Sequence, residues 1–242
     1  MAAGTMAAPA RRRPLALVLL ALATGCGAPD GGVRPPGRAV AVAAGYRQSC
    51  ALLEDGTVRC WGLKLFGQSG DGTPKTSGTA VAVPELTGAV GLSFGWDHAC
   101  AVLADRTVRC WGGNGCGELG DGTTKSANAP VAVAGLANAV AVAAGDYHTC
   151  ALLGDGTVRC WGCNWDGGLG DGTTENSSTP VPVAALAGAV GLAVRTSGSS
   201  GSVLSCAVLA DGTVRCWGEN TWGQLGDGTL QDSVVPLAVQ GL

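Results

Sequence analysis

The sequence predicts an all-β protein, a propeller-type array of four four-stranded blades. The stretch Cys150–Thr173 occurs four times with variations, and its copies start at Cys50, Cys100, Cys150 and Cys206. A fixed period of this size is typical of solenoids, propellers and other arrays of supersecondary units. The 41 glycines and the charged share of 14% favour short strands and tight turns over helices.

The N-terminus has the pattern of an export signal. A basic cluster, Arg11–Arg13, precedes the apolar run Leu15–Ala23, which is too short to span a bilayer but fits a signal peptide. Small residues then lead directly into Cys26, which resembles a bacterial lipobox. The resemblance implies cleavage before Cys26 and attachment of lipid to its sulfur. An ordinary cleaved signal followed by an unmodified cysteine is the alternative.

These features divide the chain into three parts. We expect residues 1–25 to be a lipoprotein signal peptide and residues 26–37 to be a flexible tether rich in Gly and Pro. Residues 38–242 form the four-repeat domain. Its repeats are expected at about 38–87, 88–137, 138–187 and 188–242. The chain is therefore predicted to be exported and anchored in the bacterial cell envelope, where it contacts the membrane only through its lipid.

One repeat shows why each blade should have four strands. Ala139–Ala144 is small and β-branched and reads as an inner strand. Thr149–Leu153 and Thr157–Trp161 flank an Asp-Gly turn, which is the pattern of a hairpin. A second Gly-rich turn at Gly167–Thr173 leads to Pro180–Val183, whose prolines allow only a short outer strand. Four strands per repeat is typical of a propeller blade.

The second repeat departs from the hairpin pattern at one position. Arg106 stands where the other copies have Gly56, Gly156 and Gly212. We expect the turn to need a positive φ there, which costs a non-glycine residue about 1 kcal/mol.

The repeat motif resembles that of the regulator of chromosome condensation family. The matching pattern is G-x-x-H-T-x-A-L from Gly145, followed by D-G-T-V-R-C-W-G-x-N-x-x-G-x-L-G-D-G. The resemblance implies a β-propeller, whose typical ring in this family has seven blades. Four copies with matching ends, Ala39–Gly45 and Pro236–Leu242, fit either a closed four-bladed ring or an open arc. An open arc would expose faces that invite a partner or self-association.

Eight of the 11 cysteines form four pairs at one spacing. The pairs are Cys50/Cys60, Cys100/Cys110, Cys150/Cys160 and Cys206/Cys216. Each pair should lie directly opposite across its hairpin, where two α-carbons are close enough for a disulfide worth roughly 2–3 kcal/mol. Export would place them in an oxidising compartment. Cys116 and Cys163 lie in equivalent loops of neighbouring blades, so an inter-blade disulfide and two free thiols both remain open.

Metals, cofactors and nucleic acids are not expected as ligands. His98 and His148 occupy matching positions in the repeat without nearby carboxylates, which favours a structural role. The Gly-Asp-Gly-Thr turns each offer one carboxylate, which we expect to bond its own backbone rather than calcium. The net charge of −3 becomes more negative once Arg11–Arg13 leave with the signal, so phosphate backbones should not be attracted.

Aromatic residues gather in the loops that vary most between copies. They are Tyr46, Phe66, Trp96, Tyr147, Trp165 and Trp222. Aromatic side chains on loops that a rigid scaffold holds are typical of a partner-binding surface. Local packing between blades is the alternative.

These observations favour a binding protein over an enzyme. We find no Ser-His-Asp set in register, no paired carboxylates on one loop and no cluster of metal ligands. We expect a non-catalytic, envelope-anchored scaffold that binds a protein partner. One alternative is an enzyme inhibitor, because secreted propellers of similar repeats block β-lactamases. Another is a nucleotide-exchange regulator of a small GTPase, as in the family's best-known member, which the signal peptide and the four copies disfavour.

Overall fold

The computed structural model describes residues 37–63, 66–73, 75–195 and 202–242. The chain divides into two units, residues 1–35 and 36–242, and all of the described residues belong to the second. The predicted signal peptide and Cys26 therefore lie outside the described residues. Within the described ranges, no helix has the length and hydropathy needed to cross a bilayer.

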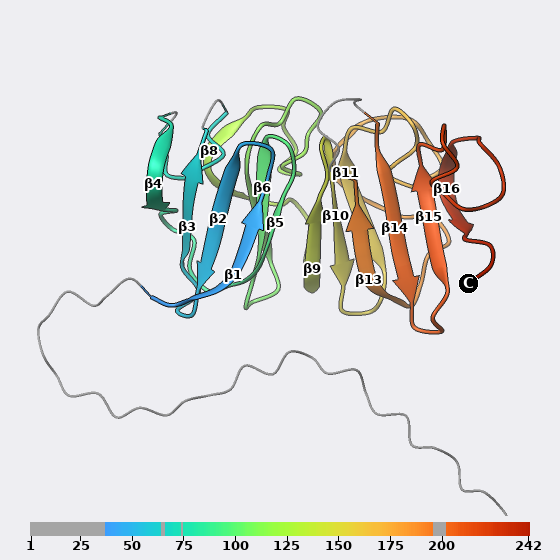
Figure 1. The fold of residues 1–242 in the computed structure, drawn as a ribbon, viewed down its shortest axis with the longest axis horizontal. Coiled ribbons are helices and arrows are strands. Elements are labelled where there is room, and N and C mark those ends of the chain that lie inside the picture. The colour runs from blue at the N-terminus through green and yellow to red at the C-terminus, as the bar shows by residue number, and fades with distance from the viewer. Residues whose placement is uncertain (1–36, 64–65, 74, 196–201) are drawn as a thin grey trace, which may run out of the picture. The chain divides into compact units, whose positions relative to one another are not determined.

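The described chain forms four antiparallel sheets, and each sheet contains four strands in chain order (Figure 1). The sheets comprise β1 (Ala39–Ala44), β2 (Gln48–Leu53), β3 (Val58–Gly62) and β4 (Ser77–Ala82); β5 (Ala89–Phe94), β6 (His98–Leu103), β7 (Val108–Gly112) and β8 (Ala127–Ala132); β9 (Ala139–Ala144), β10 (His148–Leu153), β11 (Val158–Gly162) and β12 (Ser177–Pro182); and β13 (Ala189–Val194), β14 (Leu204–Leu209), β15 (Val214–Gly218) and β16 (Ser233–Ala238). The predicted all-β array of four four-stranded blades is confirmed.

The outer strand of the third blade is longer than its prolines suggested. β12 runs from Ser177 to Pro182 and pairs on one side with β11, with Arg159 opposite Pro182. As the last strand of its sheet, β12 needs backbone donors on that side only. The missing N–H groups of Pro180 and Pro182 are therefore tolerated at the edge.

The hairpin turns are capped by their own aspartates, in the way that the sequence predicted for the Gly-Asp-Gly-Thr turns, where Thr73 N, Thr123 N, Thr173 N and Thr229 N donate to the aspartate of the turn. Asp55 Oδ1 accepts hydrogen bonds from Thr57 N at 3.0 Å and from Thr57 Oγ1 at 2.6 Å. The same two bonds recur in the other three blades at Asp105, Asp155 and Asp211. Stabilisation of the carboxylate by its threonine lowers the pKa of these three aspartates.

Arg106 adopts the positive φ that the sequence predicted, 65°. Its guanidinium Nη1 donates to Asn138 Oδ1 at 2.7 Å, and Asn138 itself has a φ of 63°. The hairpin turns of the first and third blades instead face Gly88 and Gly188. Both residues of the contact at Arg106 therefore differ from those at the other turns, and a hydrogen bond offsets part of the backbone strain.

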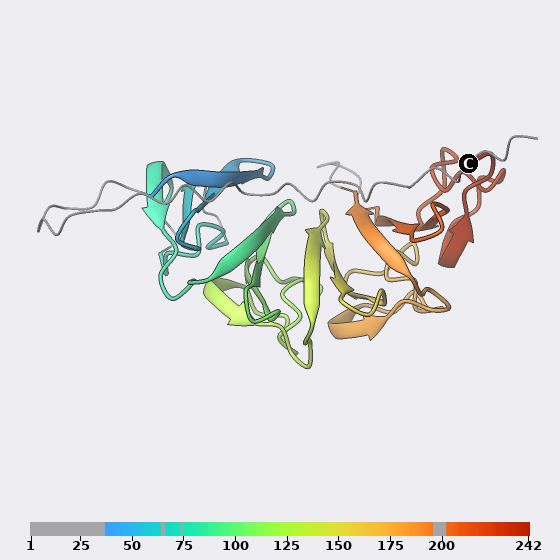
Figure 2. The same ribbon diagram turned by 90° about the horizontal axis from the view of Figure 1, so that it is seen from below.

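The four blades are arranged as an open arc (Figure 2). Neighbouring blades contact each other through their inner strands, β1 with β5, β5 with β9 and β9 with β13. Ala89, Ala139 and Ala189 at the start of β5, β9 and β13 are buried, whereas the equivalent Ala39 of β1 is exposed. Of the two arrangements that the sequence left open, the structure has the arc.

A tryptophan links each blade to the one before it. Trp111, Trp161 and Trp217 are fully buried, and each indole Nε1 donates to a backbone carbonyl in a loop of the preceding blade. The acceptors are Gln68 O at 2.8 Å, Glu118 O at 2.7 Å and Gly168 O at 2.8 Å. These tryptophans thus join neighbouring blades through a directed hydrogen bond as well as through packing.

The structure joins all four hairpin pairs of cysteines as disulfides. In each hairpin the two cysteines are direct partners across the ladder, with α-carbons 4.0–4.1 Å apart. The four bonds have the pairing that the spacing predicted: Cys50–Cys60, Cys100–Cys110, Cys150–Cys160 and Cys206–Cys216. The second cysteine of each pair lies on the third strand of its blade, directly after the hairpin turn, and is buried. These cysteines are Cys60, Cys110, Cys160 and Cys216.

A fifth disulfide joins two blades. Cys116 and Cys163 are bonded to each other, with α-carbons 5.0 Å apart, and this bond links the second blade to the third. The sequence left a disulfide and two free thiols open for this pair, and the structure has the disulfide.

We predict that ten cysteines resist alkylation until the protein is reduced, because each one is bonded to another. Intact mass after alkylation, with and without prior reduction, counts them. A gain of ten labels upon reduction is expected, and a gain of eight would show that Cys116 and Cys163 are free thiols in solution.

We predict that replacing Gly by Arg in one hairpin turn and Arg by Gly in another change the free energy of unfolding by unequal amounts. Gly156→Arg should lower the free energy of unfolding by about 1–2 kcal/mol, because Gly156 has a φ of 79° and a Cβ there would meet Gly188 Cα at 3.1 Å. Arg106→Gly should change it by less than about 1 kcal/mol, because strain relief is offset by loss of the bond to Asn138. Urea titration of both variants tests this, and equal and opposite shifts would contradict it.

Candidate binding surface

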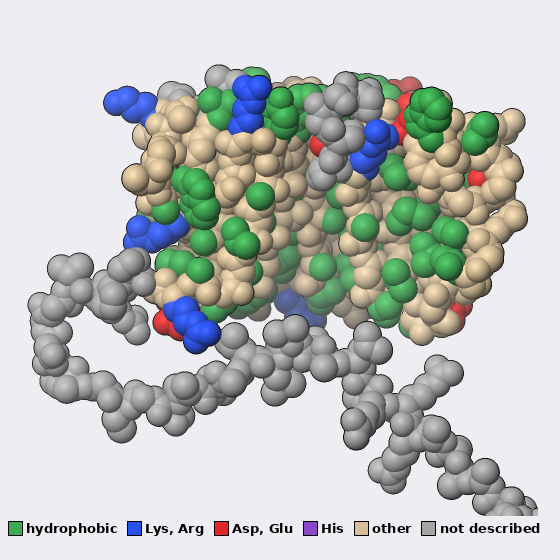
Figure 3. All heavy atoms as spheres, viewed as in Figure 1, with side chains coloured by type: hydrophobic (Ala, Val, Ile, Leu, Met, Phe, Trp, Pro, Cys, Tyr) green, Lys and Arg blue, Asp and Glu red, His purple; other side chains and the backbone are tan. Residues whose placement is uncertain are grey.

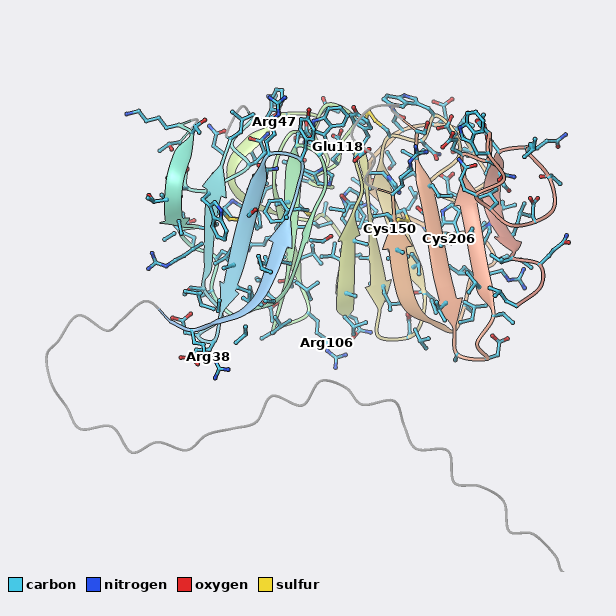
Figure 4. The ribbon with its side chains drawn as sticks, in the orientation of Figure 1. Arg38, Arg47, Arg106, Glu118, Cys150 and Cys206 are labelled. Carbon is cyan, nitrogen blue, oxygen red and sulfur yellow. A yellow bond between two sulfur atoms is a disulfide. The ribbon has the colours of Figure 1, made fainter. Side chains whose placement is uncertain are left out.

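The variable loops of all four blades meet at one edge of the arc. Because neighbouring strands run antiparallel, the β1–β2 and β3–β4 loops of the first blade leave from the same edge, and the hairpin turn leaves from the opposite one. The other blades repeat this arrangement. Figure 4 shows Arg47, from a β1–β2-type loop, at the upper edge, and Arg106, from a hairpin turn, at the lower edge. Hydrophobic side chains are visible along the upper edge in Figure 3.

Four of the predicted aromatic residues form a continuous row across three blades. We call this the aromatic row: Tyr46, Trp96, Tyr147 and Trp165. Ring centroids are 5.2 Å apart between Tyr46 and Trp96, 5.5 Å between Trp96 and Tyr147, and 5.7 Å between Tyr147 and Trp165. The rings are tilted by 42–51° to their neighbours. This spacing is within the range of favourable aromatic contacts, so the row holds its own side chains in place.

The aromatic row is packed and still open to a partner. Its two ends, Tyr46 and Trp165, are 53% and 52% exposed, and its two central rings are half-buried. The remaining candidates, Phe66 and Trp222, are 47% and 85% exposed. The sequence left binding and local packing as alternatives, and the geometry is compatible with both at once.

A small pocket lies beside the first end of the aromatic row, between the first and second blades. It has a volume of about 60 Å³, and its lining includes Tyr46, Phe66, Trp96 and Arg47. The Arg47 guanidinium lies over the Tyr46 ring, 4.7 Å from its centroid, and Nη2 donates to the Tyr46 hydroxyl at 3.2 Å. The pocket has room for the tip of one side chain, and its lining includes one basic residue, Arg47, and one acidic residue, Asp97.

A buried asparagine holds the β3–β4-type loop in three blades, and the sequence interpretation gave it no role. In the second blade Asn114 Nδ2 donates to Thr123 O at 3.1 Å and Lys125 O at 3.0 Å, while Oδ1 accepts from Leu119 N at 2.9 Å. Asn164 and Asn220 make the same three bonds in the third and fourth blades. The recurring Trp-Gly-x-Asn was the available signal for this residue.

The two histidines join neighbouring blades, which fits their predicted structural role, although a carboxylate does lie near one of them: Asp97 Oδ1 is 3.8 Å from His98 Nδ1. His98 Nε2 lies 2.8 Å from Thr149 Oγ1, and His148 Nε2 lies 2.9 Å from Ser205 Oγ. Both bonds join one blade to the next, and both imidazoles are fully buried. Burial, and to a lesser extent the charge of His98, lowers the pKa of His148 to about 3. In the folded protein His148 therefore stays neutral down to a pH of about 3.

One group of residues in the described part of the chain has the spacing of a metal site, but its two sulfur atoms are joined in a disulfide. Cys116, Glu118 and Cys163 present ligand atoms within 4.8 Å of one another. The two cysteines are bonded to each other, so they offer no thiolate. Glu118 Oε2 instead accepts a hydrogen bond from Cys116 N at 2.9 Å, and burial raises the pKa of its carboxyl group.

Two family models match the chain along most of its described length. Both describe the regulator of chromosome condensation (RCC1) repeat. One matches residues 107–152, 155–207 and 211–242, and the other matches residues 39–68, 89–118 and 139–167. The chain belongs to the RCC1 repeat family. The resemblance found in the repeat motif is thereby confirmed, and neither model describes an enzyme. A search of curated proteins finds no match.

Solved structures of other proteins have a similar fold. Human WBSCR16 is 24% identical with a TM-score of 0.73, and the match covers 84% of this chain and 53% of that one. Yeast Prp20 bound to Kap60 is 21% identical with a TM-score of 0.74, covering 86% of this chain and 50% of that one. A second structure of Prp20 from Saccharomyces cerevisiae is 21% identical with a TM-score of 0.73, covering 84% and 50%. The chain thus spans about half the length of these structures.

We predict that His148→Gln removes part of the loss of stability in acid. The pKa of His148 is 6.5 in the unfolded chain and about 3 in the folded one. At a pH between these two values, His148 therefore takes up a proton when the protein unfolds. Stability therefore falls as the pH drops from 6.5 to 3, by about 2 kcal/mol between pH 7.5 and pH 5 for this group. Gln48 occupies the equivalent position in the first blade, so glutamine suits the site.

Urea unfolding of both proteins at pH 7.5 and pH 5, followed by tryptophan fluorescence, measures this effect. Glu118, whose raised pKa acts in the opposite direction, is present in both proteins and cancels in the comparison. Equal pH dependence in the two proteins would contradict the prediction.

Proposed function

We propose that the chain is a non-catalytic, envelope-anchored scaffold that binds a protein partner through the aromatic row and the pocket beside it. The observation that carries this proposal is the row itself, a contact between rings of three blades at the edge where the variable loops meet. Hydrogen bonds common to the repeats hold the blades, while the residues of the row differ from copy to copy.

The mutual packing of the rings favours binding. A partner that meets flexible side chains must lose their conformational entropy, whereas rings already held by their neighbours cost little to immobilise. Tyrosine and tryptophan also combine a large apolar area with a polar group, and they are enriched among the residues that dominate binding energy. Tyr46 and Trp165 each expose about half of their surface for such contacts.

The pocket indicates which part of a partner would anchor there. Its aromatic lining and volume of about 60 Å³ suit the end of one apolar side chain. Arg47 would pair with a carboxylate beside that side chain, and Asp97 in the same lining would pair with a cation. We therefore propose a partner surface with an apolar side chain next to a charged one.

The related structures support a protein as the class of partner. One yeast structure contains Prp20 bound to Kap60, and the other is described together with the binding of Prp20p to Gsp1p and histones. At 21% identity, and over half of that chain, these partners belong to Prp20 itself. They support protein binding by this architecture and not a particular partner for this chain.

The proposed lipid anchor fits the position of the aromatic row. The described chain enters the first blade near Arg38, which lies at the lower edge, while Arg47 lies at the upper edge (Figure 4). A tether between Cys26 and Arg38 would therefore join the domain at the edge opposite the row.

We predict that the partner binds the aromatic row and not the exposed apolar surface in general. The full chain, immobilised and exposed to envelope extract, should enrich a partner that is lost with Trp96→Ala or Trp165→Ala. Val190→Ala is the matched control, because Val190 is 60% exposed but lies on the inner strand β13. The loss expected for a central aromatic anchor is about 30-fold or more in affinity.

Quantitative mass spectrometry of the captured proteins, followed by binding measurements with the purified partner, gives the result. If both tryptophan variants retain every protein that the wild type enriches, the row is not the binding surface.

A further inference from the structure

A carboxyl group lies beside the disulfide that joins the second and third blades. The sulfur atoms of Cys116 and Cys163 and a carboxylate oxygen of Glu118 all lie within 4.8 Å of one another. Among the described residues, this is the only group of three cysteine, histidine or carboxylate side chains that are so close together. No hairpin disulfide therefore has a described carboxylate or imidazole this close to both of its sulfur atoms.

The fold does not require a carboxyl group at the position of Glu118. Its Oε2 atom accepts a hydrogen bond from Cys116 N at 2.9 Å. In the first and fourth blades a glutamine makes the equivalent bond, with Gln68 Oε1 and Gln224 Oε1 accepting at 3.0 and 2.7 Å. An amide thus closes this turn as well as a carboxyl group does. Of these three loops, only the one that contains a cysteine has an ionisable group here, which points to a role in the chemistry of the sulfur atoms.

Contacts with the third blade hold Glu118 in place near the upper edge of the arc (Figure 4). Its backbone carbonyl accepts hydrogen bonds from Trp161 Nε1 at 2.7 Å and from Thr149 Oγ1 at 2.9 Å. Glu118 is 2% exposed. The carboxyl group is therefore fixed against the disulfide and shielded from water.

The surroundings of Glu118 favour the protonated carboxyl group. Burial raises its pKa and the Asp97 carboxylate acts in the same direction, whereas the charge of His98 and the hydrogen bond from Cys116 N act against them. Burial also raises the pKa of nearby Tyr147, with a contribution from carboxylates that include Glu118, so this phenol stays neutral while Glu118 titrates. A carboxyl group with a raised pKa keeps its proton closer to neutral pH and is suited to donate it.

The two sulfur atoms of the inter-blade disulfide differ in their access to solvent. Cys116 is partly exposed, whereas Cys163 is fully buried. An external thiolate can therefore reach the sulfur of Cys116, and Cys163 is then the leaving group. A thiolate is unfavourable in a buried site, so a proton donor beside Cys163 assists cleavage of the bond. Cys206 is the one hairpin cysteine that is partly exposed, and no described carboxylate lies beside both sulfur atoms of its disulfide.

We propose that Cys116 and Cys163 form a thiol–disulfide exchange site that reacts with a dithiol, and that Glu118 passes a proton to and from Cys163. A thiolate of the dithiol attacks Cys116 Sγ and forms a mixed disulfide, while Cys163 leaves with the bonding electron pair and takes the proton of Glu118. The second thiol of the dithiol loses its proton to solvent and displaces the Cys116 thiolate. Cys116 and Glu118 then take protons from solvent. The dithiol is oxidised to a disulfide, and the cysteine pair gains its two electrons.

Exchange at this site would affect the aromatic row. Cys163 N donates a hydrogen bond to Tyr147 O at 2.8 Å, and Trp165 follows two residues later in the chain. Tyr147 and Trp165 are the two members of the row whose ring centroids lie 5.7 Å apart. Reduction removes the covalent link between blades next to this contact. The exchange reaction itself needs no partner on the row, so it can be tested independently of the proposed binding function.

The rate of reduction by dithiothreitol tests the role of Glu118. The full chain, as wild type and as Glu118→Gln, is incubated with dithiothreitol over a range of pH and quenched by alkylation, and peptide mass spectrometry quantifies the label at each cysteine. In the wild type, Cys116 and Cys163 should be labelled before the hairpin cysteines. Glu118→Gln should slow their reduction by about 10-fold or more at about pH 6, with rates expressed per dithiothreitol thiolate.

The pH profile separates proton donation from a structural role. In the wild type, the rate per thiolate should fall as the pH rises through the pKa of Glu118, because the ionised carboxylate has no proton to donate and repels the departing thiolate. In Glu118→Gln this rate should not vary with pH. Glu175→Gln is the matched control, because Glu175 is exposed on the β11–β12 loop that also carries Cys163, and its profile should match that of the wild type.

Three results would each overturn the proposal. They are a wild-type rate per thiolate that does not change with pH, a Glu118→Gln variant that is reduced as fast as the wild type or faster, and hairpin cysteines that are labelled before Cys116 and Cys163. Near-ultraviolet circular dichroism shows whether the variant is folded. Glutamine at the equivalent positions of two other blades favours folding, and the wild-type profile decides by itself if the variant does not fold.

Discussion

The hydrogen bond from each buried tryptophan to the preceding blade is the interaction on which the arc depends. It fixes the distance between blades at the edge where the loops meet, because a ring at one repeat position must reach one carbonyl. The close approach of each tryptophan to the loop of the preceding blade also explains why glycine recurs at one position of that loop. A Cβ at Gly120 would lie 2.7 Å from Trp161 Nε1, and one at Gly170 would lie 2.6 Å from Trp217 Nε1. These glycines also have positive φ angles, so two independent constraints select the same residue.

The disulfides complement this interaction inside each blade. The sheets are short and rich in glycine and alanine, so each blade alone buries little apolar surface. A hairpin disulfide holds its two central strands together without requiring a large side chain. The bond between Cys116 and Cys163 acts at a different level, since it ties the second blade to the third beside the buried Glu118. Stability of the arc thus combines covalent bonds within blades with packing and hydrogen bonds between them.

Much of the fold could be predicted from the sequence because its determinants are local. The Asp-Gly turns, the paired cysteines and the unusual Arg106 all lie within one hairpin, where spacing decides geometry. The Cys116–Cys163 bond could not be decided in this way, because it depends on the angle between two blades. The aromatic row depends on the same angle, since Tyr46, Trp96 and Tyr147 come from different blades. The network around Asn114 was local and could have been predicted, because an asparagine that follows Trp-Gly-x in three copies needs a common partner.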